Sequence, residues 1–269
     1  MNKKALLVGI NYIGTPNQLG GCINDVLNVQ EILLTEYGYK AENILLLTDN
    51  TTYKPSKANI ISGFAWLLTA DSNSNFNPAN YSTRSAVATG QHNYFHYSGH
   101  GTRVSSHWQN HDAICPLDFA NSGMMSDGEI SSYLTHRVPP NSDLNATIDA
   151  CHSANCFDLD WTCKPFNLGL GYSLQQISNF PPTNAPVMML SGCQDNQTSS
   201  DLVTNNYEGI RQDQGALTCT LLKVLQENKY NISCEQLLYK VCNDIKVLSQ
   251  QIPAMTFGQK INIDSPYSM

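Results

Sequence analysis

Strand-like and helix-like segments alternate along most of this chain, and this alternation constrains its fold more than any other feature. Short apolar runs predict strands at 4–10, 43–48, 94–98, 145–150, 186–190 and 254–263. Apolar residues at helical spacing predict helices at 24–37, 56–70, 215–226 and 233–248, with Ser56 as the N-cap of the second. Because parallel strands are joined by crossover helices, the pattern predicts an α/β fold with a central, mostly parallel sheet flanked by helices on both faces.

Glycine and proline residues divide the chain into two unequal regions. They gather between positions 159 and 184 and predict a loop or linker there. We therefore expect a single domain over residues 1–269. It would consist of a larger region (1–160), a linker (161–184) and a smaller region (185–269).

The charge and the hydrophobic runs exclude two classes of partner. The net charge of −7 argues against nucleic acid, because phosphate binding requires clustered Lys and Arg. No apolar run approaches the roughly 20 residues that span a bilayer. The apolar run Ala5–Ile10 after Lys3 and Lys4 superficially resembles a signal peptide, but it is too short and reads better as a first buried strand. We expect no membrane partner and a cytoplasmic location.

The cysteines support the same compartment. The chain has nine, scattered and without pairs at metal-binding spacing. Neither a disulfide framework nor a structural zinc site is predicted, so reduced thiols are expected.

Two predicted strands end in reactive residues. Tyr94–Thr102 contains His100, and Ala146–Ser153 contains Cys151. In a parallel sheet, ligands lie beyond the carboxyl ends of the strands. We therefore expect His100 and Cys151 to meet in one cleft, although they are far apart in the sequence.

A cysteine and a histidine placed together can cleave an acyl bond. The imidazole accepts the thiol proton, and the thiolate attacks a carbonyl carbon. The backbone at Gly101 and the amide of Cys151 are candidate oxyanion-binding groups. From the residues alone two other readings stay open: a cysteine in an apolar strand is often a core residue, and a histidine between glycines often belongs to a turn.

At these residues the chain resembles the metacaspases. His96–Gly101 (HYSGHG) and Asp149–Ser153 (DACHS) resemble their two active-site motifs. The similarity extends to Lys4–Ile10, Gly21–Val26, Ala113–Asp118, Leu190–Thr198 and Gly215–Thr218. Their order resembles type I metacaspases without the N-terminal prodomain. The resemblance implies a caspase-like fold, Cys151 as nucleophile, His100 as general base and a monomeric active form.

The residue two positions before Cys151 indicates which substrate side chain is favoured. Asp149 lies two positions before Cys151, so both side chains point to the same side of an ideal strand. A carboxylate there favours Arg or Lys beside the scissile bond. The resemblance implies that Cys22, Asp25, Ser98 and Asp149 line this pocket. Asp25 could instead be an ordinary acid favoured by a helix dipole.

The resemblance also implies a calcium site. Several metacaspases are activated by Ca²⁺ held by aspartates, and the matching positions are Asp112, Asp127 and Asp158. Ca²⁺ prefers six to eight oxygen ligands. The family pattern has an acidic pair where this chain has Asp127-Gly128, so we expect weakened calcium affinity, which Glu129 or Asp118 could offset.

The calcium residues also have a purely structural reading. Ser126–Glu129 has the spacing of a capping box before a short helix. In that reading the aspartates are a helix cap and two loop acids.

The expected reaction is hydrolysis of peptide bonds after Arg or Lys through an acyl-enzyme thioester. The substrates would be peptides or proteins. Lys164, Arg84 and Arg103 are candidate self-cleavage positions. The alternatives are a catalytically silent caspase-like scaffold, a paracaspase- or legumain-like peptidase, and a peptide ligase.

The remaining histidines and cysteines are expected to be structural. His152 should point away from Cys151 in an ideal strand, and His96 and His107 are expected in packing or at the surface. The other cysteines fall in apolar or helical contexts and are expected in the core: Cys115, Cys156, Cys163, Cys193, Cys219, Cys234 and Cys242.

Overall fold

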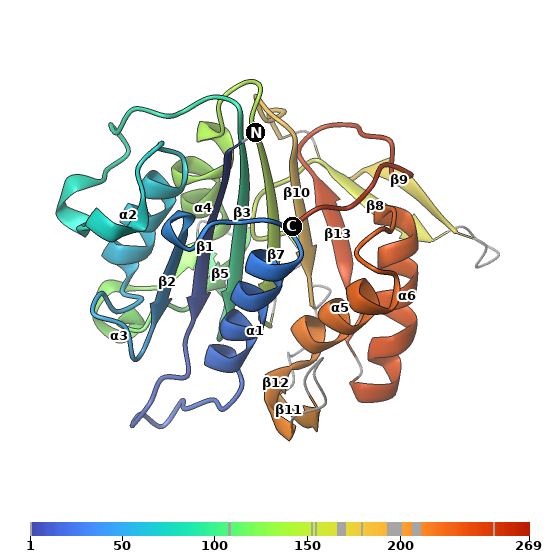
Figure 1. Cartoon of the computed structure of the whole chain (residues 1–269), viewed down its shortest axis with the longest axis horizontal. Coiled ribbons are helices and arrows are strands. Elements are labelled where there is room, and N and C mark those ends of the chain that lie inside the picture. Colours follow the sequence, from blue (N-terminus) through green and yellow to red (C-terminus); the bar gives the residue numbers. More distant parts are fainter. Residues whose placement is uncertain are drawn as a thin grey trace.

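A computed structural model gives the fold (Figure 1), and it describes residues 2–106, 109–151, 153, 155–165, 171–178, 180–192, 201–205, 211–249 and 251–269. Its centre is an eight-stranded sheet. In spatial order the strands are β2 (Ile44–Thr48), β1 (Asn2–Gly9), β3 (Gln91–Ser98), β7 (Asp143–Asp149), β10 (Val187–Ser191), β13 (Ala254–Phe257), β8 (Trp161–Pro165) and β9 (Tyr172–Gln176). The first five are parallel, and the last three pair antiparallel.

Helices cover both faces of this sheet. One face carries α1 (Cys22–Thr35), α5 (Ala216–Glu227) and α6 (Cys234–Leu248), as Figure 1 shows. The other carries α2 (Lys57–Leu67) and α4 (Asp127–Tyr133), with the short α3 (Phe119–Ser122) nearby. Short 3₁₀ helices lie at Ala41–Asn43, Asn73–Asn75, Pro78–Asn80 and Thr135–Arg137. The predicted α/β class with a mostly parallel sheet is therefore confirmed.

Strand alternation divides the core into two layers. In β1, Leu6 and Val8 pack toward α2, whereas Ala5 and Leu7 pack toward α1, and all four are fully buried. Side chains of a strand point alternately to its two faces, so a strand covered on both sides reads as a continuous apolar run. This is why the apolar runs located the central strands from sequence.

Local signals also placed the helix starts. The Ser56 side chain accepts a hydrogen bond from Asn59 N–H and caps α2 as predicted. At α4 the capping box predicted at Ser126 and Glu129 is present in both directions. Each bond satisfies an amide that the helix itself cannot.

The predicted linker is wrong for much of its length. Residues 161–184 include β8 and β9, which pair with each other and extend the sheet beyond β13. Five further strands, in two small sheets, also escaped prediction: β4 (Gly101–Ser106) with β5 (Gln109–Ile114) and β6 (Met125–Ser126), and β11 (Asp201–Asn205) with β12 (Arg211–Gly215). The last strand, expected to reach 263, ends at Phe257. Of the strands that escaped prediction, β8 pairs with the distant β13, whereas the others pair with strands nearby in the sequence.

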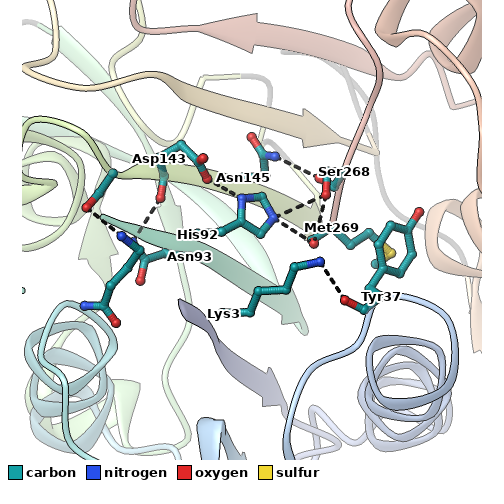
Figure 2. A network of polar contacts seen from close by, with 10 residues as sticks. Lys3, Tyr37, His92, Asn93, Asp143, Asn145, Ser268 and Met269 are labelled. Carbon is teal, nitrogen blue, oxygen red and sulfur yellow. Dashed lines mark hydrogen bonds and ion pairs between the residues drawn. The ribbon is translucent and has the colours of Figure 1, made fainter. Parts of the chain in front are cut away.

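The final residues of the chain dock against the amino ends of β3 and β7 (Figure 2). An imidazole nitrogen of His92, Nε2, lies 2.7 Å from the carbonyl oxygen of Met269, and its other ring nitrogen contacts the Asp143 carboxylate. Asn145 donates to the carbonyl oxygen of Ser268 over 2.8 Å. This network lies at the amino ends of β3 and β7, far from the Ser98–Asp149 pair at their carboxyl ends.

Within the described residues, no helix has both the length and the apolar character that a bilayer crossing would need.

A buried lysine closes the end of α2. Lys4 in β1 is fully buried, and its Nζ donates to the carbonyl oxygens of Trp66, Thr69 and Asp71 at 2.7, 2.9 and 2.8 Å. The last carbonyls of a helix have no partner within it. An ammonium has three N–H donors, so Lys4 uses all of them here.

We predict that Lys4→Met lowers the free energy of unfolding by about 3 kcal/mol, because several buried carbonyls lose their donor. Urea denaturation measures the loss. Lys3→Met is the matched control: Lys3 is half-buried and donates to one carbonyl, that of Tyr37 (Figure 2), so its loss should stay near 1 kcal/mol or less. Equal losses in the two variants would contradict this account.

A second prediction concerns pH. Burial lowers the pKa of His96 in β3 from 6.5 to about 3. Below pH 6.5 the unfolded chain therefore binds a proton that the folded chain does not, and stability falls as the pH drops from 6.5 toward 3. We expect the free energy of unfolding of His96→Gln to depend less steeply on pH in this window, by about 1.4 kcal/mol per pH unit. Parallel curves for the two proteins would refute it.

Candidate active site

The register of two neighbouring strands brings the candidate catalytic residues together. β3 and β7 are parallel, and their last pair is Ser98 with Asp149. His100 and Cys151 each follow two residues later, beyond the same edge of the sheet. A further backbone bond, from Gly99 N–H to the Asp149 carbonyl oxygen (3.3 Å), holds the two chain ends side by side.

A backbone carbonyl orients the imidazole of His100. Its Nε2 lies 2.8 Å from the carbonyl oxygen of Asn17. Because a carbonyl only accepts, Nε2 carries the proton in this contact. In the neutral ring, Nδ1 then holds the lone pair and is the atom that can act as a base. Sequence reasoning missed Asn17, because any residue can supply a carbonyl.

Two tyrosines hold the backbone of His100. The Tyr12 hydroxyl accepts from His100 N–H over 3.0 Å and donates to the Cys115 carbonyl over 2.6 Å. The Tyr97 hydroxyl donates to the His100 carbonyl over 2.8 Å. Burial raises the pKa of both phenols well above 10, so both stay neutral donors. The ring of Tyr12 also lies 4.8 Å from the imidazole, centroid to centroid.

The backbone at Tyr12 is unusual, with φ at +50°. A non-glycine residue rarely adopts this left-handed conformation, and the cost is borne only where surrounding contacts fix it. Here the fixed position places the phenol against His100. Neither tyrosine was singled out from sequence.

Cys151 differs from the other described cysteines in its accessibility. It is half-buried, whereas Cys22, Cys115, Cys156, Cys163, Cys219, Cys234 and Cys242 are buried. Burial also raises the pKa of several of these, to about 11 for Cys115 and about 12 for Cys163. The predicted core role of Cys115, Cys156, Cys163, Cys219, Cys234 and Cys242 is therefore confirmed. A thiol needs access and thiolate character to react, and among the described cysteines Cys151 is the accessible one. Cys193 lies outside the described residues, as do His107 and His152.

Gly101 permits the chain to pass over Cys151. A Cβ at Gly101 would lie 1.9 Å from the Cys151 carbonyl oxygen and 3.1 Å from the Ala150 Cβ. The backbone itself must move to relieve such a contact. Glycine is therefore required here by close approach.

The acids of the predicted specificity pocket lie together at the amino end of α5. Asp25 from α1 is fully buried; it accepts from Gly215 N–H at 2.9 Å and from the Ser98 hydroxyl at 2.5 Å. Cys22, two per cent exposed, begins the same helix. The bond to Ser98 joins α1 to the end of β3. Asp25 thus has a role beyond that of a surface acid in a first helical turn.

Asp149 is bound by the first turn of α5. It is three per cent exposed, and its Oδ2 accepts from both the N–H and the hydroxyl of Thr218, each at 2.8 Å. A Cβ on Gly215 would lie 2.2 Å from an oxygen of Asp149 and 2.7 Å from one of Asp25. The first turn of α5 therefore faces both carboxylates, and its amides and dipole favour their charged forms. Thr218 was quoted only as part of a motif; its contact with Asp149 had no signal in the sequence.

The three aspartates predicted to hold calcium line one pocket. Asp112, Asp127 and Asp158 surround it with Arg103, Asn110, Asn155 and Phe180. Burial, and then repulsion from Asp127, raises the pKa of Asp158 to about 6. Yet nowhere in the described part of the chain do three His, Cys, Asp or Glu side chains converge as metal ligands would.

The two residues that could have supplied a further ligand are also engaged elsewhere. Glu129 forms an ion pair with Lys57 at 2.8 Å, and Asp118 accepts from Lys57 N–H at 2.8 Å. As arranged, the cluster does not fit the open set of six to eight oxygens that calcium prefers.

The fold and the site together define a class of protein. Adjacent parallel strands that end in a histidine and an accessible cysteine, within this layered α/β sheet, are those of a caspase-like cysteine peptidase. The crystal structure of protein GSU0716 from Geobacter sulfurreducens is similar in fold, with a TM-score of 0.66 and 18% identity, over 98% of this chain and 97% of that one. At that identity the likeness concerns the fold alone.

The sequence comparisons give the family. The description "Metacaspase, peptidase C14 domain" matches residues 3–160. Metacaspase-2 of Trypanosoma brucei brucei is 30% identical over 99% of this chain and 76% of its own length. Metacaspase-1 of Schizosaccharomyces pombe is 28% identical over 97% and 68%, and metacaspase-1 of Plasmodium falciparum is 30% identical over 97% and 41%. The chain belongs to the metacaspase family, and the enzyme class is cysteine-type endopeptidase.

We predict that Gly101→Ala abolishes peptidase activity, because the added methyl group would displace the Cys151 backbone. Turnover of a peptide substrate measures the loss, and circular dichroism checks folding. Gly128→Ala is the matched control: a Cβ there meets only an oxygen of Asp158, at 3.9 Å. Full activity in Gly101→Ala would show that the close approach to Cys151 is not needed.

Proposed function

We propose that this metacaspase hydrolyses peptide bonds after Arg or Lys, with Cys151 as nucleophile and His100 as general base. The observation that carries the proposal is the orientation of His100. Its Nε2–H is held by the Asn17 carbonyl, which leaves Nδ1 as the basic atom. His100 follows β3, and the accessible Cys151 follows the neighbouring strand, β7. Peptide or protein chains would be the substrates.

The reaction follows from these groups. Nδ1 of His100 takes the proton from the Cys151 thiol, and the thiolate attacks the scissile carbonyl carbon. The amides of Gly101 and Cys151 would stabilise the oxyanion that forms. The imidazolium then protonates the leaving amine, and a thioester remains on Cys151. Water, deprotonated by His100, hydrolyses the thioester and regenerates the thiol.

The specificity for basic residues rests on Asp25 and Asp149. Two buried carboxylates at one end of the sheet create a strongly negative environment, even with the amides of α5 beside them. A guanidinium or ammonium group is the substrate side chain that such a site favours. Cys22 and Ser98 would complete the pocket wall.

Among the candidate self-cleavage positions, the structure favours Arg84. Lys164 lies within β8, where it pairs with Ser173 and precedes a proline. Arg103 lies within β4 and is bonded to Asp112. Arg84 is exposed in the loop before β3, and a protease requires an accessible, extended segment. We therefore propose processing after Arg84. The active form would be a monomer. The compartment would be reducing and cytoplasm-like, as the thiols of the described cysteines, which form no disulfides, favour.

We predict that the purified protein cleaves fluorogenic peptides that end in Arg or Lys, and not those that end in Asp. Cys151→Ala should be inactive. Asp149→Asn should lower kcat/KM for Arg peptides by roughly 30-fold or more, because removal of one charge from a buried pair costs about 2 kcal/mol or more. Asp149→Glu keeps the charge and serves as the conservative control.

The outcomes separate the rival functions. Cleavage after Asp would refute the basic specificity and leave the Cys151–His100 pair in place. Mass spectrometry of the products would reveal joined peptides if the enzyme is a ligase. No turnover of any peptide, by a folded protein, would favour the silent scaffold.

A further inference from the structure

The acidic cluster beside the active site already has an arginine and a histidine as partners. The Nδ1 atom of His111 lies 2.9 Å from Oδ1 of Asp127, and Nε of Arg103 lies 3.0 Å from Oδ1 of Asp112. Arg103 and Asp112 are directly opposite each other in the β4–β5 hairpin. Arg103 therefore neutralises the acid opposite it in the hairpin, and His111 of the same hairpin contacts the acid that begins α4.

The carboxylate oxygens of Asp127 accept further bonds. Its Oδ1 also accepts from Gly128 N–H over 2.6 Å, and its Oδ2 accepts from Asp112 N–H over 3.1 Å. With the His111 contact, both oxygens of Asp127 are bonded by protein groups. Three of the roughly four acceptor sites of this carboxylate are therefore used by protein groups.

The carboxylate of Asp112 is occupied in the same way. Its Oδ1 accepts from Arg103, and its Oδ2 accepts from Asn155 N–H over 3.4 Å. Asn155 follows Cys151 by four residues, so this bond connects the hairpin to the segment after the nucleophile. The cluster thus connects the hairpin that follows His100 to the segment that follows Cys151.

One place in the cluster lacks a ligand that a metal site could use. A Cβ at Gly128 would be free of close contacts and would lie 3.9 Å from an oxygen of Asp158. A side chain at this position would face Asp158, and glycine supplies none. Room for a further carboxylate is present, but the carboxylate is not.

We propose that His111 and Arg103 take the place of calcium in this metacaspase, so that the hairpin and the segment after Cys151 are held in position without a divalent cation. The proposal goes beyond the peptidase function, because it concerns what fixes the site. Arg103 supplies a positive charge to the acidic cluster, and His111 and backbone amides supply further contacts. The enzyme is then active even when the calcium concentration is low.

Thermal unfolding tests the proposal directly. After treatment with EGTA, wild-type protein should show the same Tm in millimolar CaCl₂ as in millimolar MgCl₂. Peptide turnover should also be unchanged by EGTA. A rise in Tm specific to Ca²⁺, or a loss of turnover in EGTA that Ca²⁺ restores, would overturn the proposal.

A gain-of-function variant tests which residues exclude calcium. His111→Asp combined with Gly128→Asp replaces the histidine partner of Asp127 by a carboxylate and adds a second carboxylate facing Asp158. Saturating CaCl₂ should then raise Tm by roughly 5 °C or more, since an ion bound only to the folded state stabilises it. The matched control, His111→Asn with Gly128→Asn, has the same size without the charges and should not respond.

Terbium luminescence gives a second readout that requires no activity. Tb³⁺ should bind the Asp variant and be displaced by Ca²⁺, with neither effect in the wild type. If the folded Asp variant fails to bind either ion, His111 and Gly128 are not what excludes calcium, and the assignment is wrong. Because unfolding and luminescence are measured without substrate, a failure of the proposed specificity would leave this test intact.

Discussion

The parallel pairing of β3 with β7 is the constraint on which the rest of the site depends. Their last paired residues, Ser98 and Asp149, fix where both chains leave the sheet. Because parallel strands end at the same edge, His100 and Cys151 emerge side by side. The contacts with Asn17 and Tyr12 then set the direction of the imidazole, and Gly101 lets the chain pass close to Cys151.

The amino end of α5 solves the electrostatic problem that the site creates. Asp25 and Asp149 are almost wholly buried, and a buried carboxylate without partners would be costly. Gly215 and Thr218 supply N–H donors from the first turn of a helix, where the dipole also favours negative charge. The same contacts join the C-terminal part of the chain to α1 and β7. The atoms that join these elements are therefore those of the proposed specificity pocket.

The second acidic cluster follows the same physical rule with different partners. Charged groups in a protected place are satisfied by donors from the chain, here Arg103 and His111, together with backbone amides. For Asp25 and Asp149 a helix terminus supplies the partners. For Asp112 and Asp127 the side chains of Arg103 and His111 do. Both arrangements position segments next to Cys151, which connects charge balance to catalytic geometry.

The sequence by itself determined the elements whose signals are local. Apolar runs marked the central strands, Ser56 and the Ser126–Glu129 box marked two helix starts, and two polar segments at strand ends marked His100 and Cys151. Tertiary structure alone decided the rest. The strands β8 and β9 form because β13 offers an edge, and the Asn17 carbonyl orients His100 although every residue has a carbonyl. Thr218 binds Asp149, an acid distant in the sequence. His111 contacts Asp127, an acid placed by a helix. A local pattern records what a residue is, whereas these roles depend on what the folded chain brings beside it.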